Sequence, residues 1–158
     1  MSLGIYRRHK MTHSPDPDCI FCKIVRREAP ASIVYEDAST LAFMDIRPVT
    51  AGHTLVIPKA HGAYLEDLPE GSVGPILESA RKVASALRKS GLKCEAVNLW
   101  IANGREAGQE VFHVHVHAIP RFRGDGFGLR APPGSGRTAD RDELDRVAGK
   151  IRNAVGRQ

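Results

Sequence analysis

The chain has 158 residues, a length typical of one domain with a sizeable core, and its 42% hydrophobic and 26% charged content is ordinary for a globular protein. No apolar run approaches the roughly 18 residues of a membrane span, no signal-peptide pattern is present, and three cysteines are few, so we expect a cytoplasmic protein with no membrane partner. The net charge of +5 suits phosphate-bearing ligands, but the basic residues are dispersed, which argues against nucleic acid as a partner.

The first half of the chain predicts an arm, a short helix and three strands. Residues 1–18 carry no apolar periodicity and indicate a flexible N-terminal arm. Apolar residues at helical spacing over 20–25 predict a short helix, which Pro30 ends. Three stretches rich in β-forming residues predict strands: Ile33–Glu36, Thr40–Ile46 and His53–Ile57.

The second half predicts one long helix, two strands and a C-terminal segment. Apolar residues recur three and four positions apart over 73–87, which predicts an amphipathic helix that stops near Gly91. Strands are expected at 96–102 and 111–119, separated by a loop over 103–109. Residues 125–158 form a separate segment. A glycine-rich irregular stretch over 123–139 leads into it and is followed by a helix from about Asp140. The order predicts an α+β fold, an antiparallel five-stranded sheet with helices on one side.

Three histidines alternate with apolar residues in the last predicted strand. Side chains of a strand alternate between its two faces, so His113, His115 and His117 should share one face. Val114 and Val116 should enter the core from the other face. Imidazoles are poor core fillers, and three together need partners, so this face is a candidate active site.

Cys19 and Cys22 form a C-x₂-C pair, which is half of a common zinc site. His61 and His113 are available as the other half, because zinc accepts mixed sets of two cysteines and two histidines. A thioredoxin-like redox pair and two inert thiols are the alternatives. Cys94 stands alone and is expected to be a small buried residue.

Four ordered motifs resemble the histidine triad (HIT) family, in its bacterial Hint-like branch. They are Leu41–Pro48, Gly52–Lys59, Asn103–Val111 and His113–Ile119, and the resemblance covers residues 19–124. In one departure, Glu110 stands where many relatives carry a small hydroxyl residue that contacts phosphate. The resemblance implies an HIT domain over 19–124 that binds AMP-containing nucleotides.

The resemblance also implies a mechanism. His115 is the expected nucleophile, attacking the α-phosphorus to give a nucleotidyl-histidine that water then cleaves. His117 is expected to contact the phosphate and protonate the leaving group. Amide groups around Gly108 and Gln109 are expected to receive the negative oxygens, which makes Gln109 a third candidate catalytic residue.

For the nucleoside, the resemblance implies an apolar slot for the base and polar contacts to the ribose. Asp45 offers two carboxylate oxygens to the ribose hydroxyls, and Asn103 is expected on the ribose-phosphate side unless it caps a turn. His53 is expected near the pocket, with its role open. The base slot is expected to consist of Phe21, Ile24, Phe43 and Ile46.

Metal and assembly follow from the same resemblance. Zinc-bearing HIT proteins hold the metal at places similar to Cys19, Cys22, His61 and His113, so a zinc ion here should be structural and leave His115 free. Hint-like relatives form symmetric dimers. The β-rich stretch 96–102 would be hazardous as an open sheet edge, and pairing it with its copy in a homodimer removes that hazard.

Several functions compete at this stage. The leading hypothesis is a hydrolase or nucleotidyl transferase acting on adenosine 5′-phosphoramidates or related adenylates. Alternatives are a dinucleoside polyphosphate hydrolase and a nucleotide-binding regulatory module with weak turnover. A nucleic-acid end processor would need a DNA-binding appendage, and residues 123–158 contain no cysteine or histidine for a zinc finger. A metal hydrolase that uses the three histidines as zinc ligands is also conceivable.

Overall fold

The structure, a computed structural model, describes residues 15–128 and 131–156. The chain divides into two compact units, Met1–Gly126 and Phe127–Gln158. Residues 1–14 of the predicted arm lie outside the described residues, and the boundaries expected at residues 19 and 124 stay predictions. No helix in the described ranges is both long and apolar enough to span a bilayer.

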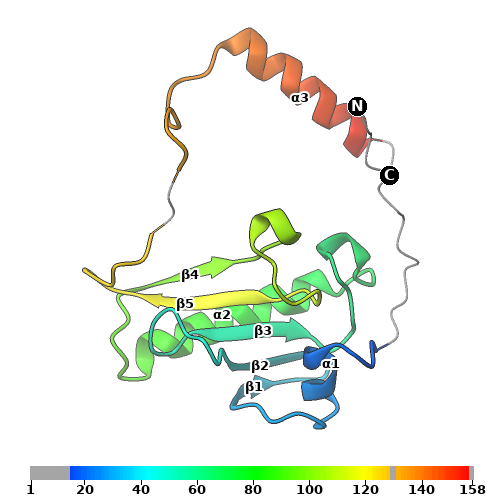
Figure 1. The fold of residues 1–158 in the computed structure, drawn as a ribbon, viewed down its shortest axis with the longest axis vertical. Helices are drawn as coiled ribbons and strands as arrows, with labels where there is room; N and C mark the ends of the chain where they lie inside the picture. The colour runs from blue at the N-terminus through cyan, green and yellow to red at the C-terminus, as the bar shows by residue number, and fades with distance from the viewer. Residues whose placement is uncertain (1–14, 129–130, 157–158) are drawn as a thin grey trace. The chain divides into compact units, whose positions relative to one another are not determined.

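The first unit is built on a five-stranded antiparallel sheet (Figure 1). The strand order is β1-β2-β3-β5-β4, so β4 lies at one edge and β5 is paired on both sides. The predicted α+β sheet is therefore confirmed. The strands are β1 (Ile33–Glu36), β2 (Thr40–Met44), β3 (Thr54–Pro58), β4 (Ala96–Trp100) and β5 (Val116–Arg121).

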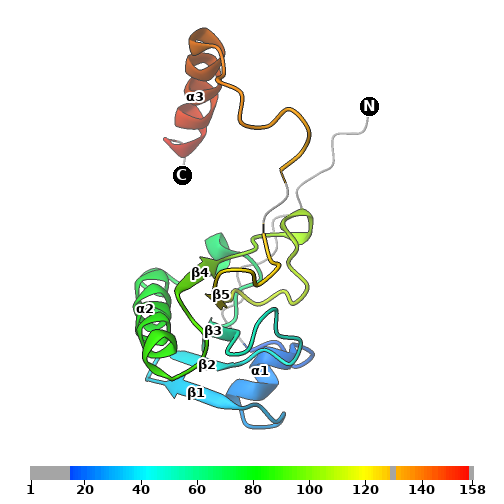
Figure 2. The same ribbon diagram turned by 90° about the vertical axis from the view of Figure 1, so that its left-hand side faces the viewer.

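Both faces of the sheet are covered, which explains why β2 and β3 are almost entirely apolar. Helix α2 (Val73–Lys89) packs on one face, against side chains such as Ala42 and Val56. Helix α1 (Ile20–Val25) packs on the opposite face, against their neighbours Leu41, Phe43, Leu55 and Ile57. Figure 2 shows the two helices on either side of the strands. The expectation that helices share one side was wrong for α1, because an apolar helix face does not specify which side of a sheet it covers.

The histidine strand begins later than the sequence predicts. Residues 111–115 are not in the ladder. The Val114 N–H donates instead to the carbonyl of Gly62 at 2.8 Å, and the His113 N–H donates to that of Val111 at 2.9 Å. Strand β5 then runs past the predicted end to Arg121. The predicted alternation still holds in part, because Val114 and Val116 are buried in the core under α2.

The second unit contains helix α3 (Arg141–Val155), close to its predicted start. Asp140 caps the helix, and its carboxylate accepts the backbone N–H groups of Asp142 and Glu143. The apolar face of α3 is solvent-exposed within the described residues, with Ile151 and Val155 the most open.

Candidate functional site

A pocket of about 1030 Å³ lies on the face of the sheet that carries α1. This volume is at the upper end of the range usual for small-molecule sites. Most of the residues predicted to bind a nucleotide line it: Phe21, Ile24, Phe43, Asp45, Ile46, Gly108, His115 and His117. His53, Asn103 and Gln109 are not among the lining residues.

One part of the pocket wall is apolar and rigid. Phe21 from α1 and Phe43 from β2 are buried, and their rings meet edge to face with centroids 5.4 Å apart. Ile24 is buried beside them, whereas Ile46 is 94% exposed beyond the end of β2. Phe21 also meets the ring of His115 at 5.4 Å, which places the apolar wall directly beside the candidate nucleophile.

His115 is held in one tautomer. Its Nδ1–H donates to the backbone carbonyl of His113 at 2.7 Å, so the lone pair of a neutral ring lies on Nε2. The ring is buried, and burial lowers its pKa below the ordinary value, although the His113 carbonyl and the charge of Asp45 act in the opposite direction. The arrangement leaves one unprotonated nitrogen on a residue that lines the pocket.

A pair of hydrogen-bonded imidazoles, His53 and His117, lies beside His115. The Val49 backbone N–H donates to Nδ1 of His53 at 3.2 Å, so His53 carries its proton on Nε2 and donates it to Nδ1 of His117 at 2.9 Å. Neutral His117 therefore carries its own proton on Nε2. His53 does not line the pocket but determines the tautomer of a histidine that does.

The environment of His117 predicts a pH-dependent stability. Burial, with His115 and His53 adding to it, lowers the pKa of His117 to about 4, while the charges of Asp45 and Glu110 act in the opposite direction. The unfolded chain takes up this proton near the ordinary imidazole pKa of 6.5, so the free energy of unfolding should fall as the pH drops from 6.5 toward 4. Urea unfolding across this range should show a shallower decline for His117→Asn. Equal declines in both proteins would contradict the assignment.

Asp45 lies in the connection between β2 and β3. Its Oδ1 accepts the Arg47 backbone N–H at 2.8 Å, and its Oδ2 lies 3.6 Å from Nδ1 of His53. The side chain is largely buried at the pocket wall, and its second oxygen lies on the side of the histidines. Asp45 thus combines a fixed backbone position with a carboxylate that a ligand can reach.

Two predicted site residues have other partners. The buried Gln109 side chain accepts from the Gly104 N–H and donates to the carbonyls of Ala63 and Val111. Asn103 is bonded to the backbone of Leu65 and to Glu66. Neither side chain is brought to the pocket, which removes the geometric support for a side-chain role of Gln109 in catalysis and of Asn103 at the ribose.

The backbone of this loop is also occupied. The N–H groups of Gly108 and Gln109 donate to the carbonyls of Arg105 and Gly104, at 2.9 and 3.1 Å. Gly108 has a φ of 90°, a conformation that disfavours residues with a side chain, so the plain turn explains this glycine. These two amides would have to exchange a turn hydrogen bond for a phosphate oxygen.

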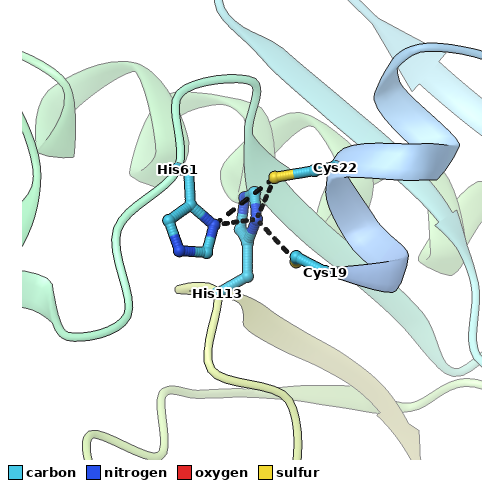
Figure 3. A group of neighbouring side chains, drawn as sticks. All are labelled: Cys19, Cys22, His61 and His113. Atoms are coloured by element: carbon cyan, nitrogen blue, oxygen red, sulfur yellow. Dashed lines mark hydrogen bonds between the residues drawn. The ribbon is translucent and has the colours of Figure 1, made fainter. Parts of the chain in front are cut away.

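A group of cysteine and histidine side chains outside the pocket joins α1 to residues 111–115, the triad segment, which leads into β5 (Figure 3). Nδ1 of His113 lies 3.5 Å from Sγ of Cys19 and 3.6 Å from Sγ of Cys22. Nδ1 of His61 lies 3.4 Å from both Sγ of Cys22 and Nδ1 of His113. The predicted metal ligands are therefore brought together, and all four donor atoms lie within 4.8 Å of one another.

The donor set fits a tetrahedral zinc ion. Ligands about 2.0–2.3 Å from a common centre are separated by ~3.3–3.8 Å, which matches the four separations of 3.4–3.6 Å that involve His61, His113 or both. Nε2–H of His113 donates to the Pro58 carbonyl at 2.9 Å, so its Nδ1 lone pair lies toward the cysteines. Burial raises the pKa of the Cys22 thiol to about 11, so a thiolate there requires a cation.

Other metal arrangements are poorer. Asp45, His53 and His117 also lie close together, but the two imidazole nitrogens are hydrogen-bonded at 2.9 Å, which leaves no space for an ion between them. His115 belongs to neither of the ligand clusters found among the described residues. The three triad histidines therefore do not converge on one metal, contrary to the metal-hydrolase alternative.

A family profile described as the HIT domain matches residues 26–124. The chain belongs to the HIT family. An uncharacterized HIT-like protein of Borreliella burgdorferi is 47% identical over 114 residues, 72% of this chain and 82% of that one. The adenosine 5′-monophosphoramidase HNT1 of Saccharomyces cerevisiae is 42% identical over 106 residues, 67% of this chain and 64% of its own length. The Zn-bound histidine triad family protein of Mycobacterium smegmatis is 43% identical with a TM-score of 0.68, and the match covers 82% of this chain and 88% of that one.

The sequence interpretation missed two features of the pocket of this HIT domain. Arg47 lines it and forms an ion pair with Glu110, a residue 63 positions later. The Glu110 departure was visible in the sequence, but its partner was not, because no local pattern links the two residues. Residues 29–32, after α1, also line the pocket and carried no signal beyond Pro30.

Proposed function

We propose that the chain is a HIT-type hydrolase or nucleotidyl transferase that cleaves adenosine 5′-phosphoramidates or related adenylates through a nucleotidyl-His115 intermediate. The observation that carries the proposal is the Nδ1–H bond from His115 to the His113 carbonyl, which leaves Nε2 unprotonated on a pocket-lining ring. The name of the yeast relative, an adenosine 5′-monophosphoramidase, supports the substrate class.

The reaction then takes two displacements. Nε2 of His115 attacks phosphorus, and the bond to the departing amine breaks, with its electron pair passing to the amine nitrogen. The phosphate charge raises the pKa of His117 in the complex, so that His117 enters this step as the imidazolium, with a second proton on Nδ1 donated to Nε2 of His53. His53 then carries its own proton on Nδ1, which faces Asp45. His117 gives the amine the proton on Nε2 and is left neutral. Water then attacks the phosphorus, His117 takes back one proton, and AMP leaves with His115 regenerated. In this scheme His53 is a positioning residue, since it bonds Nδ1 of His117.

The pocket supplies matching contacts for adenosine. Phe21, Ile24 and Phe43 form the apolar wall for the base, with Ile46 at its exposed rim. Asp45 is the proposed partner of the ribose hydroxyls, because its carboxylate lies at the pocket wall, 3.6 Å from His53. Gly108 also lines the pocket, and its N–H would have to exchange the turn hydrogen bond to Arg105 for a phosphate oxygen.

Cys19, Cys22, His61 and His113 would hold a structural zinc ion. When bound, the ion would supply a cross-link between α1 and the segment leading into β5, rather than Lewis-acid chemistry. None of the four ligands lines the pocket. His113 is thereby assigned to the metal, and His115 stays free for the nucleotide.

The proposal is tested by a substrate panel with mass detection of the trapped intermediate. An AMP phosphoramidate, an adenylate anhydride and a dinucleoside polyphosphate should be compared at equal concentration. We expect the phosphoramidate to have the highest kcat/KM and the quenched enzyme to carry AMP on the His115 peptide. Preference for the polyphosphate would favour the dinucleoside polyphosphate hydrolase, and AMP binding without turnover would favour the regulatory module.

We further expect a homodimer. Strand β4 lies at the sheet edge, and Leu99 on it and Leu77 on α2 are 46% and 49% exposed. Joining two β4 edges about a two-fold axis would satisfy the edge and should bury well over about 1,000 Å² in total. Light scattering on a sizing column should give a dimer mass, and Leu99→Lys should shift it toward the monomer. A monomer mass for the wild-type chain at micromolar concentration would contradict the dimer and leave the pocket proposal untouched.

A further inference from the structure

An exposed ion pair lies at the mouth of the pocket. Arg47 follows β2 and Glu110 precedes the triad segment, and the guanidinium donates to the Glu110 carboxylate. Both side chains line the pocket together with His115 and His117. They are 76% and 70% exposed, and exposed ion pairs contribute little to folding. The two charges therefore matter more to a ligand than to the fold.

The carboxylate stands on the shorter of the two side chains, next to a residue with a fixed side chain. Glu110 directly follows Gln109, whose buried side chain is fixed by three backbone hydrogen bonds. Arg47 follows the almost fully exposed Ile46, and its charge stands at the end of a longer side chain. The charge of Glu110 also acts on His117, raising its pKa against the stronger lowering by burial. Glu110 is thus close to the group that faces the departing amine.

We infer that Glu110 selects the leaving group by charge, favouring amines that carry an additional positive charge and disfavouring leaving groups that carry a negative one. This inference rests on the proposed function, in which the leaving group departs beside His117. Arg47 neutralises Glu110 in the free protein, and a cationic leaving group takes the place of Arg47. The exchange is easy because both partners are exposed. The small hydroxyl residue of many relatives would make no such distinction.

Three AMP phosphoramidates test the inference, with putrescine, n-butylamine or γ-aminobutyrate as the leaving amine. They share the P–N bond and a four-carbon chain, and they differ in the charge at the far end. For the wild-type enzyme we expect kcat/KM for the putrescine compound to exceed that for the γ-aminobutyrate compound by about tenfold or more. Added salt should reduce this ratio, because it screens exposed charges.

Variants assign the effect to the carboxylate. Glu110→Gln should bring the ratio toward one, and Arg47→Gln should increase it by releasing Glu110 from its partner. Glu78→Gln is the matched control, because Glu78 forms an exposed ion pair with Arg81 on α2, which packs on the opposite face of the sheet. Its ratio should equal that of the wild type.

The outcomes separate this inference from the proposed function. If Glu110→Gln turns over all three compounds with a ratio within about twofold of the wild type, selection by Glu110 is rejected and the hydrolase proposal stands. If the wild-type enzyme turns over none of the three, the proposed function fails, and the inference fails with it. A Glu110→Ser enzyme that behaves as Glu110→Gln would strengthen the charge argument.

Discussion

Replacing His115 with alanine is expected to lower turnover of an AMP phosphoramidate by about four orders of magnitude, because the covalent step has no other nucleophile. AMP should still bind, since the apolar wall and Asp45 remain in place. Single-turnover kinetics measure the loss, and titration calorimetry measures the affinity for AMP. Mass spectrometry of the quenched reaction should find nucleotidyl-enzyme in the wild type and none in the variant.

A second variant controls for the hydrogen bond that alanine removes together with the nucleophile. His115→Asn can still offer an N–H to the His113 carbonyl, the bond that holds the wild-type ring at 2.7 Å, but its amide is no nucleophile. It should lose as much turnover as His115→Ala. If either variant kept more than about a tenth of wild-type turnover, nucleophilic catalysis by His115 would be rejected.

The alternation of the triad was predictable because the period of two belongs to any extended chain. Val114 lies outside the ladder, yet it packs in the same core as Val116, as the pattern predicts. The ladder boundary was not predictable. It depends on a contact with a distant loop: β3 continues to Pro58, but it pairs with β5 only through Thr54, Leu55 and Val56, and the Val114 N–H donates to the Gly62 carbonyl instead.

The hydrogen-bond partners of Asn103 and Gln109 could not be predicted from the sequence. Asn103 and Gln109 lie in a motif that resembles the family, but their side chains bond to Leu65 and Ala63, roughly forty positions earlier. Side-chain amides bond readily to backbone groups of any nearby loop, and the sequence does not state which loop is near. The ligand cluster was predictable because structural zinc sites are typically built from cysteine and histidine, which are few in this chain.

The predicted zinc ligands also indicate the face of the sheet on which α1 packs. The apolar spacing over 20–25 predicts a helix with one buried face, but it is compatible with either face of the sheet. The cluster with His61 and His113 requires Cys19 and Cys22 to lie on the triad side, opposite α2. The predicted ligand set, together with the alternation of the triad, therefore indicates which face of the sheet α1 covers. The apolar spacing over 20–25 does not.

Substituting both Cys19 and Cys22 with serine is expected to abolish zinc binding and lower the melting temperature by on the order of 10 °C, because the cross-link between α1 and the triad segment is lost. Elemental analysis should find about one zinc per wild-type chain and none in the double variant. Affinity for AMP should fall much less than stability, since no ligand of the cluster lines the pocket.

Cys94→Ser is the control for this experiment. Cys94 is a free thiol outside the cluster, with its Sγ 3.3 Å from the carbonyl of Ala96, a contact that a serine hydroxyl can also make. Its zinc content should equal that of the wild type, and its melting temperature should change by no more than a few degrees. A strong chelator should lower the melting temperature of the wild type and of Cys94→Ser but not of the double variant. If protein made with added zinc carries none, and the chelator has no effect on it, the two cysteines are inert thiols in the core and the metal assignment is wrong.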